Sequence, residues 1–139
     1  MRQMCLGFAA LLLACSGHNP AAPLSPTGPE DLLDTWRLQA VSGQSLPYTL
    51  EQAGTRKVEL TGETVTLFAS GRQTMLTSFR VTEGGNVSTE TISAPGNYTV
   101  DGSTLLLTFD NDEDEYTAIV KDDTMTIDDI GLTFVYRRN

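Results

Sequence analysis

Carboxylates near the C-terminal end are the residues of this 139-residue chain best suited to do chemistry. Asp110, Asp112 and Asp114 alternate, as do the first oxygen ligands of a calcium-binding loop. Such a loop also needs a glycine at its sixth position and a glutamate at its twelfth, where this chain has Glu115 and Lys121. The segment therefore predicts solvated hairpin turns and no metal site, with weak calcium binding as an alternative. A two-carboxylate glycosidase is a further alternative, but its acids must face each other across a cleft, and these fall in predicted turns.

Residues for nucleophilic catalysis are missing from the part of the chain that is expected to fold. The only histidine is His18, and the only cysteines are Cys5 and Cys15. All three precede the predicted domain, so a Ser-His pair, a Cys-His pair or a zinc site of the usual type cannot be assembled in it. We therefore expect no enzymatic activity and no cofactor.

The charge balance argues against one class of partner. The chain carries 18 acidic and 9 basic residues, which gives a net charge of −9. A surface of this sign repels phosphate backbones, so we do not expect nucleic acid to bind.

The N-terminal residues have the pattern of an export signal. Arg2 precedes an apolar run over residues 6–14. That run is too short for a membrane span, which needs roughly 20 apolar residues. It ends in Leu12-Leu13-Ala14-Cys15, which resembles the lipobox of bacterial lipoproteins. The resemblance implies that residues 1–14 are a cleaved signal peptide, and that Cys15 becomes a new N-terminus carrying acyl chains such as palmitate.

Residues 15–30 connect this cysteine to the folded domain. Four of the six prolines fall in this stretch, among small residues, so it predicts a flexible tether. Stable membrane attachment needs two or more acyl chains, which a lipoprotein cysteine would supply. Ser16, and not an aspartate, follows Cys15. In the lipoproteins that the chain resembles, this implies the outer membrane, with the domain facing the periplasm.

The remaining residues, 31–139, predict one all-β domain. Apolar and polar residues alternate through a stretch rich in Thr and Val, and glycines punctuate it. We expect eight to ten short strands. Their breaks are predicted at Thr61-Gly62, Gly84-Gly85-Asn86, Ala94-Pro95-Gly96 and Asp101-Gly102. The simplest topology is an antiparallel up-and-down barrel of about eight strands, because closure removes exposed edges.

Three segments of this domain resemble the lipocalin-like domains of bacterial lipoproteins. They are Asp34-Thr35-Trp36-Arg37-Leu38, Gly96-Asn97-Tyr98-Thr99-Val100 and Phe134-Val135-Tyr136-Arg137-Arg138. The likeness spans roughly residues 32 to 138, and it implies a lipocalin-like barrel. It further implies that Trp36 plugs one end and that an arginine of the last strand, Arg137 or Arg138, lies across the indole. Parity with Phe134 and Tyr136 favours Arg138, in a structural role.

Eight apolar or aromatic side chains share the inward parity of the predicted strands. They are candidates for lining a ligand cavity, although such a stripe more often fills the core, because an eight-stranded barrel can be packed by its own side chains. The eight are Trp36, Phe79, Tyr98, Leu107, Phe109, Tyr116, Phe134 and Tyr136.

These features favour a lipid-anchored cell-envelope protein whose barrel binds a small apolar ligand. The alternative is a non-enzymatic interaction or structural protein of the envelope, with a solid barrel core, which acts through its acidic loops or its outer face. The volume of the interior discriminates between them, because a cavity of a few hundred Å³ with apolar walls favours a ligand.

The lipid anchor depends on one residue and is directly testable. We expect Cys15→Ser to abolish labelling by a radioactive fatty acid and to release the protein from the membrane fraction. A mutant that stays in the membrane fraction after a high-salt wash would show that Cys15 is not the anchor.

Overall fold

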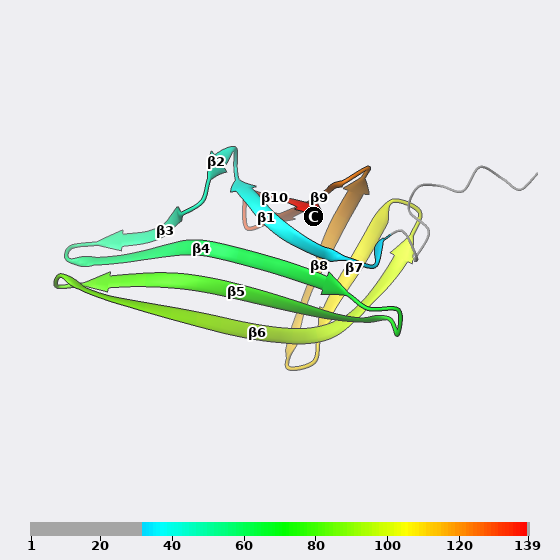
Figure 1. Cartoon of the computed structure of the whole chain (residues 1–139), viewed down its shortest axis with the longest axis horizontal. Helices are drawn as coiled ribbons and strands as arrows, with labels where there is room; N and C mark the ends of the chain where they lie inside the picture. Colours follow the sequence, from blue (N-terminus) through cyan, green and yellow to red (C-terminus); the bar gives the residue numbers. More distant parts are fainter. Residues whose placement is uncertain (1–31, 139) are drawn as a thin grey trace, which may run out of the picture.

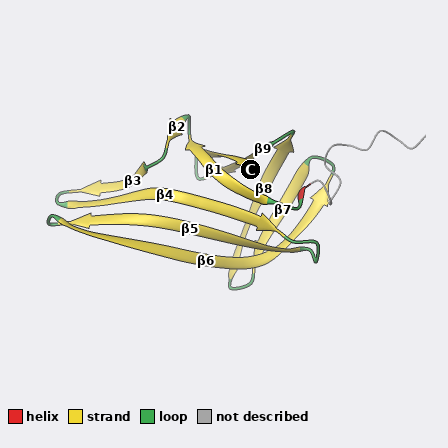
Figure 2. Cartoon of the chain, viewed as in Figure 1, coloured by secondary structure: helices red, strands yellow, loops and turns green. Residues whose placement is uncertain are grey.

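The computed structural model describes residues 32–138, which form one antiparallel β-structure (Figures 1 and 2). The predicted signal peptide 1–14, Cys15 and the tether 15–30 lie outside the described residues. No helix among residues 32–138 is long and apolar enough to cross a membrane. The ten strands are β1 (Thr35–Val41), β2 (Gln44–Ser45), β3 (Tyr48–Ala53), β4 (Arg56–Leu67), β5 (Arg72–Glu83), β6 (Asn86–Asp101), β7 (Thr104–Phe109), β8 (Asp112–Lys121), β9 (Thr124–Asp129) and β10 (Leu132–Arg138).

One pairing turns this sheet into a barrel. The strands follow the order β2-β1-β10-β9-β8-β7-β6-β5-β4-β3, and β1 also pairs with β4 through Thr35–Thr66, Trp36–Val65 and Arg37–Thr64. Strand β1 and strands β4 to β10 therefore form a closed ring, while β2 and β3 pair outside it on β1 and β4. The predicted antiparallel barrel of about eight strands is confirmed.

The inner face of the ring is the apolar core. In β1, Trp36, Leu38 and Val41 are buried, and a register shift between Leu38 and Ala40 inserts one extra residue. Without this bulge, strict alternation of side chains would place Val41 on the outer face; the extra residue returns it to the inner face. Opposite β1, Tyr136 of β10 is also buried. Residues from every strand of the ring contribute to this one core.

Two of the predicted breaks are wrong, because the chain passes through both as strand. At Thr61-Gly62, β4 has a register shift between Leu60 and Gly62, so the signal for a turn marks a bulge. At Pro95, β6 stays paired with β5. The Pro95 carbonyl accepts a hydrogen bond from the Asp110 amide at 3.0 Å. In an antiparallel strand, the N–H and C=O of one residue point toward the same neighbouring strand. The N–H that proline lacks would therefore point toward the end of β7, where the β6–β7 hydrogen bonds stop, so β6 continues through Pro95.

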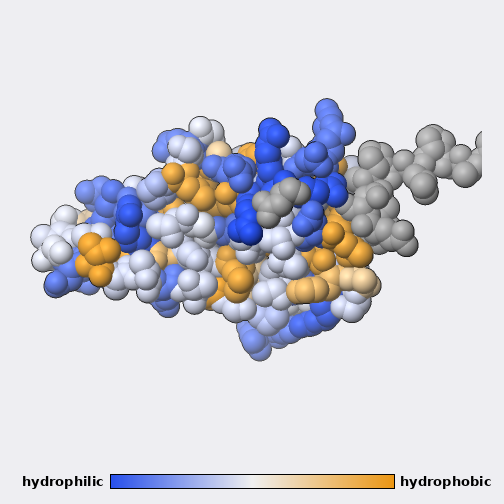
Figure 3. All heavy atoms as spheres, in the orientation of Figure 1, coloured by the Kyte–Doolittle hydropathy of each residue, from blue (hydrophilic) through white to orange (hydrophobic). Residues whose placement is uncertain are grey.

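Three strands are longer than the barrel needs. Strands β4 and β5 have 12 residues each and β6 has 16, and their far parts continue with β3 as a sheet beyond the ring (Figure 1). On this extension, Glu59 accepts hydrogen bonds and ion pairs from Lys57 at 2.7 Å and from Arg80 at 2.8 Å, which lower the pKa of Glu59. Apolar side chains are also exposed there, and Figure 3 shows them separated by hydrophilic ones.

Trp36 closes one end of the barrel. Its side chain is fully buried, and the indole Nε1–H donates to the carbonyl of Leu32 at 3.2 Å. Arg138 pairs with Trp36 across β1 and β10, and its guanidinium carbon lies 4.8 Å from the ring centroid. Such a cation–π contact contributes roughly 0.5–2 kcal/mol. The structure therefore contains the Trp36–Arg138 pair that the resemblance implied, and Asp123 holds the arginine at 3.2 Å.

Gly96 of β6 lies close against the backbone of β7. A Cβ atom at this position would lie 1.7 Å from the carbonyl oxygen of Thr108 and 2.9 Å from the amide nitrogen of Gln73. Gln73 is fully buried, and its Nε2 donates to that same carbonyl at 3.1 Å. Only glycine fits here without a shift of the backbone.

Gly96 and Gly62 form a matched pair for testing this constraint. Gly96→Ala should lower the free energy of unfolding by about 1–3 kcal/mol or more, because backbone must move to admit the methyl group. Gly62→Ala should change it by less than about 0.5 kcal/mol, since no atom lies within 4 Å of a Cβ there. Urea denaturation of the two variants checks this, and equal costs would contradict the packing described.

Candidate functional site

A cavity of about 400 Å³ lies inside the barrel, toward the end away from the Trp36–Arg138 pair. Its wall is built by β4 to β10, and it reaches the β7–β8 turn at Asn111 and the end of β9 at Asp129. This volume falls within the range of roughly 300–1,000 Å³ that small-molecule sites occupy. The interior is therefore not packed solid along its whole length.

Five of the eight predicted cavity residues line this space, namely Phe79, Phe109, Tyr116, Phe134 and Tyr136. The other three need correction, because they lie in the packed core outside the cavity wall. Trp36 and Leu107 are fully buried, and Tyr98 is 8% exposed with its hydroxyl donating to the Phe68 carbonyl at 2.7 Å. Strand parity identified the inner face for all eight, but parity carries no information on depth along the barrel axis.

The eight candidates predicted from the sequence did not include the aliphatic and the polar parts of the wall. Met75, Ala94 and Ile127 complete the apolar surface, and Glu63 and Thr77 place polar atoms on it. Glu63 has the inward parity of Val65, two residues later on β4. The expected turn at Thr61-Gly62 hid that signal, because it placed the start of the strand after Glu63.

Glu63 is held in place by two hydroxyl groups. Thr77 is its cross-strand neighbour on β5, and the Thr77 hydroxyl donates to Glu63 Oε2 at 2.6 Å. The Tyr136 hydroxyl donates to Glu63 Oε1 from β10, which is separated from β4 by β1 alone. Tyr136 is 1% exposed, and burial, followed by the charge of Glu63, raises its pKa well above the usual value. The three side chains fix a carboxylate on the cavity wall.

An aromatic corner forms the wall near the β7–β8 turn. The rings of Phe109 and Tyr116 meet edge to face, with centroids 5.3 Å apart and an interplanar angle of 71°. This geometry is one of the favoured arrangements of an aromatic pair. Burial raises the pKa of the Tyr116 hydroxyl, and the negative charges of Asp129 and Asp114 raise it further. The aromatic pair is therefore an apolar surface in a negative electrostatic potential, which the nearby aspartates produce.

The three alternating aspartates have separate roles in the structure. Asp110 makes an ion pair with Arg72, whereas Asp112 lines the cavity and accepts a hydrogen bond from the Asp114 amide at 3.1 Å. Within residues 32–138, no three His, Cys, Asp or Glu side chains are grouped in a way that could hold a metal ion. The spacing that suggested a calcium loop therefore builds the start of a strand and a cavity rim.

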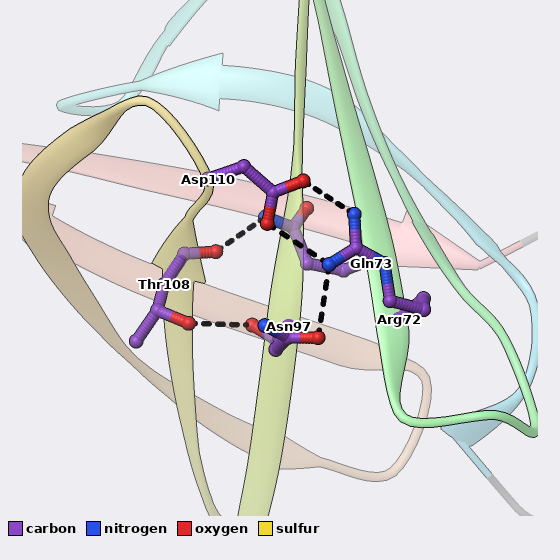
Figure 4. A network of polar contacts seen from close by, with 5 residues as sticks. All are labelled: Arg72, Gln73, Asn97, Thr108 and Asp110. Atoms are coloured by element: carbon purple, nitrogen blue, oxygen red, sulfur yellow. Dashed lines mark hydrogen bonds and ion pairs between the residues drawn. The ribbon is translucent and has the colours of Figure 1, made fainter.

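A polar network fixes the β7–β8 turn to the outside of the barrel (Figure 4). Two nitrogens of Arg72 donate to the two oxygens of Asp110, at 2.9 and 2.5 Å, and Arg72 also donates to Asn97 Oδ1 at 3.0 Å. Thr108 adds a hydrogen bond to the Asn97 carbonyl at 3.4 Å. Bidentate pairs of this kind restrict orientation as well as distance. The network therefore positions the turn that carries Asn111 and Asp112 at the cavity mouth.

The closed antiparallel ring of β1 and β4 to β10, with a cavity in its interior, defines a small β-barrel. The family model for lipocalin-like domains matches residues 32–127, and the chain belongs to that family. The match covers the barrel from Leu32 to Ile127 and ends before β10. No curated protein matches the chain.

The Arg72–Asp110 pair makes a pH-dependent contribution to stability. Hydrogen bonds from Arg72, and then its charge, lower the pKa of Asp110 below the unfolded value. A lowered pKa stabilises the fold above the unfolded pKa, and this contribution is lost as pH falls through the folded pKa. Asp110→Asn should therefore be less stable than wild type at about pH 7, and the difference should shrink by about pH 3.

Denaturant midpoints at the two pH values measure this difference. Asp101→Asn is the matched control, because Asp101 is exposed and forms no ion pair with another residue of 32–138. A destabilisation by Asp110→Asn that is equal at both pH values would show that the ion pair is not its cause.

Proposed function

We propose that this protein holds a small apolar ligand in the cavity of its barrel. The observation that carries the proposal is the preformed space of about 400 Å³ with aromatic walls. Small-molecule sites are mostly apolar concave spaces with a few placed polar groups. Phe79, Phe109 and Phe134 supply apolar surface here, and Glu63 and Thr77 supply polar atoms. Membership of the lipocalin-like family supports a binding role.

The cavity also weighs against the alternative function, which expected a solid interior. An interaction protein that used only its outer face would not need a preformed space with aromatic walls inside its barrel. The open volume is therefore better explained as a binding space. We include in the proposal that the role is non-enzymatic, on the ground that His18 and both cysteines precede the domain.

The proposed location is the bacterial outer membrane, with the domain facing the periplasm. Its support is the Leu12-Leu13-Ala14-Cys15 segment followed by Ser16. A lipid anchor would hold the barrel within reach of the bilayer, where apolar molecules concentrate. Such a location suits a protein that takes up or presents an apolar ligand.

A cavity-filling substitution tests the binding function. Ala94 lies on the cavity wall, so Ala94→Phe should place a phenyl ring in the space. We expect the affinity of the full chain for the neutral fluorophore N-phenyl-1-naphthylamine to fall about tenfold or more, equivalent to ~1.4 kcal/mol. Fluorescence titration measures this change.

Thr99→Phe is the matched control on the same strand. Thr99 is exposed on the outer face of β6, so the added ring should leave the affinity unchanged. Thermal unfolding confirms that both variants are folded. If folded Ala94→Phe binds the fluorophore as wild type does, the cavity is not the binding site. If the wild-type chain does not bind it at all, the proposed function loses its support.

A further inference from the structure

The charged part of the cavity wall has one sign. Glu63, Asp112 and Asp129 line the space, and no lysine, arginine or histidine among residues 32–138 does. On the outer faces, Arg72 pairs with Asp110 and Arg80 pairs with Glu59. No ion pair joins any of the three cavity carboxylates to a cation within residues 32–138. Their negative charge therefore acts on whatever enters the cavity.

The aromatic walls favour the same sign of ligand. The faces of aromatic rings carry negative electrostatic potential, so they attract a cation that approaches them. Five ring-bearing side chains line the cavity, and the Phe109–Tyr116 corner stands beside Asp112 in the strand pairing of β7 and β8. A cation at this corner would contact ring surface and a carboxylate together.

The negative charge of the cavity carboxylates also affects the pKa values of the two cavity tyrosines. Tyr116 and Tyr136 have raised pKa values, chiefly from burial. For both, the charges of Glu63 and Asp129 add to the shift, because they oppose formation of a phenolate. A potential that disfavours an anion at these hydroxyls stabilises a cation near them.

The three cavity carboxylates are not arranged to bind a metal ion. Its ligands must converge on one point, and the described residues contain no such group of acids, histidines and cysteines. An organic cation differs, because its charge is spread over a larger body that can contact rings and carboxylates around a cavity. We propose that the ligand is an organic cation with an apolar body, such as an alkylammonium, and that the cavity selects it over neutral and anionic molecules of the same shape.

This inference rests on the proposed binding function. Three probes, each with a chain of eight carbon atoms, distinguish failure of the inference from failure of the binding function. Octyltrimethylammonium is the cation, 1-octanol the neutral probe and octanoate the anion. Isothermal titration of the full chain should show the cation binding about tenfold more tightly than octanol, with octanoate the weakest. Octanol binding as tightly as the cation, or octanoate binding most tightly, would overturn the charge selection and leave the binding function intact. No binding by any probe would overturn both.

Charge-neutral variants assign the effect to the cavity. Glu63→Gln and Asp129→Asn should each weaken binding of the cation several-fold and weaken binding of octanol much less. Asp129 lies near the β9–β10 turn, so Asp129→Asn keeps the test valid if Glu63→Gln disturbs folding. Asp101→Asn removes the same charge from an exposed position that does not line the cavity, and it should change neither affinity. Equal weakening by Asp129→Asn and Asp101→Asn would show that only net charge matters, which would overturn the inference.

Discussion

The pairing of β1 with β4 is the interaction on which the rest of the structure depends. Three residue pairs join segments about thirty positions apart and convert an open sheet into a ring. Closure satisfies backbone groups that would otherwise form two long exposed edges. It also gives the inner face an enclosed volume, without which neither a core nor a cavity could exist. Short strands β2 and β3 are left outside, so the excursion between β1 and β4 does not interrupt the ring.

The two ends of this ring differ because their side chains differ in size. At one end, Trp36 is buried beneath Arg138 and beside Leu32, and together they close the barrel. Toward the other end, the wall combines five aromatic side chains with small ones such as Ala94 and Thr77, and a space of about 400 Å³ remains between them. A barrel of this strand number has just enough space for its own side chains, so small residues on one stretch leave a cavity there. The cavity therefore lies toward the end away from Trp36 and Arg138.

Charge is also distributed unevenly between the outer and inner faces. Outer acids such as Asp110 and Glu59 are paired with arginine or lysine, and these pairs tie neighbouring strands and the β7–β8 turn together. The inner carboxylate of Glu63 is bonded by hydroxyl groups instead. Hydroxyl groups orient a carboxylate and leave its charge in place. The same residue type therefore stabilises structure on one face and sets the electrostatics of the candidate site on the other.

The sequence by itself determined the local alternation of the strands and therefore the inner face. Phe79, Tyr116 and Phe134 could be assigned to that face because side chains alternate with a period of two, and Trp36 and Arg138 could be paired through the family resemblance. Only the tertiary structure decided where along the barrel each residue lies, because strand tilt and register depend on pairing partners distant in sequence. It placed Leu107 in solid core and Glu63 in the cavity wall. Bulges such as that at Thr61-Gly62 look like turns locally, and only pairing with both neighbouring strands keeps the chain extended through them.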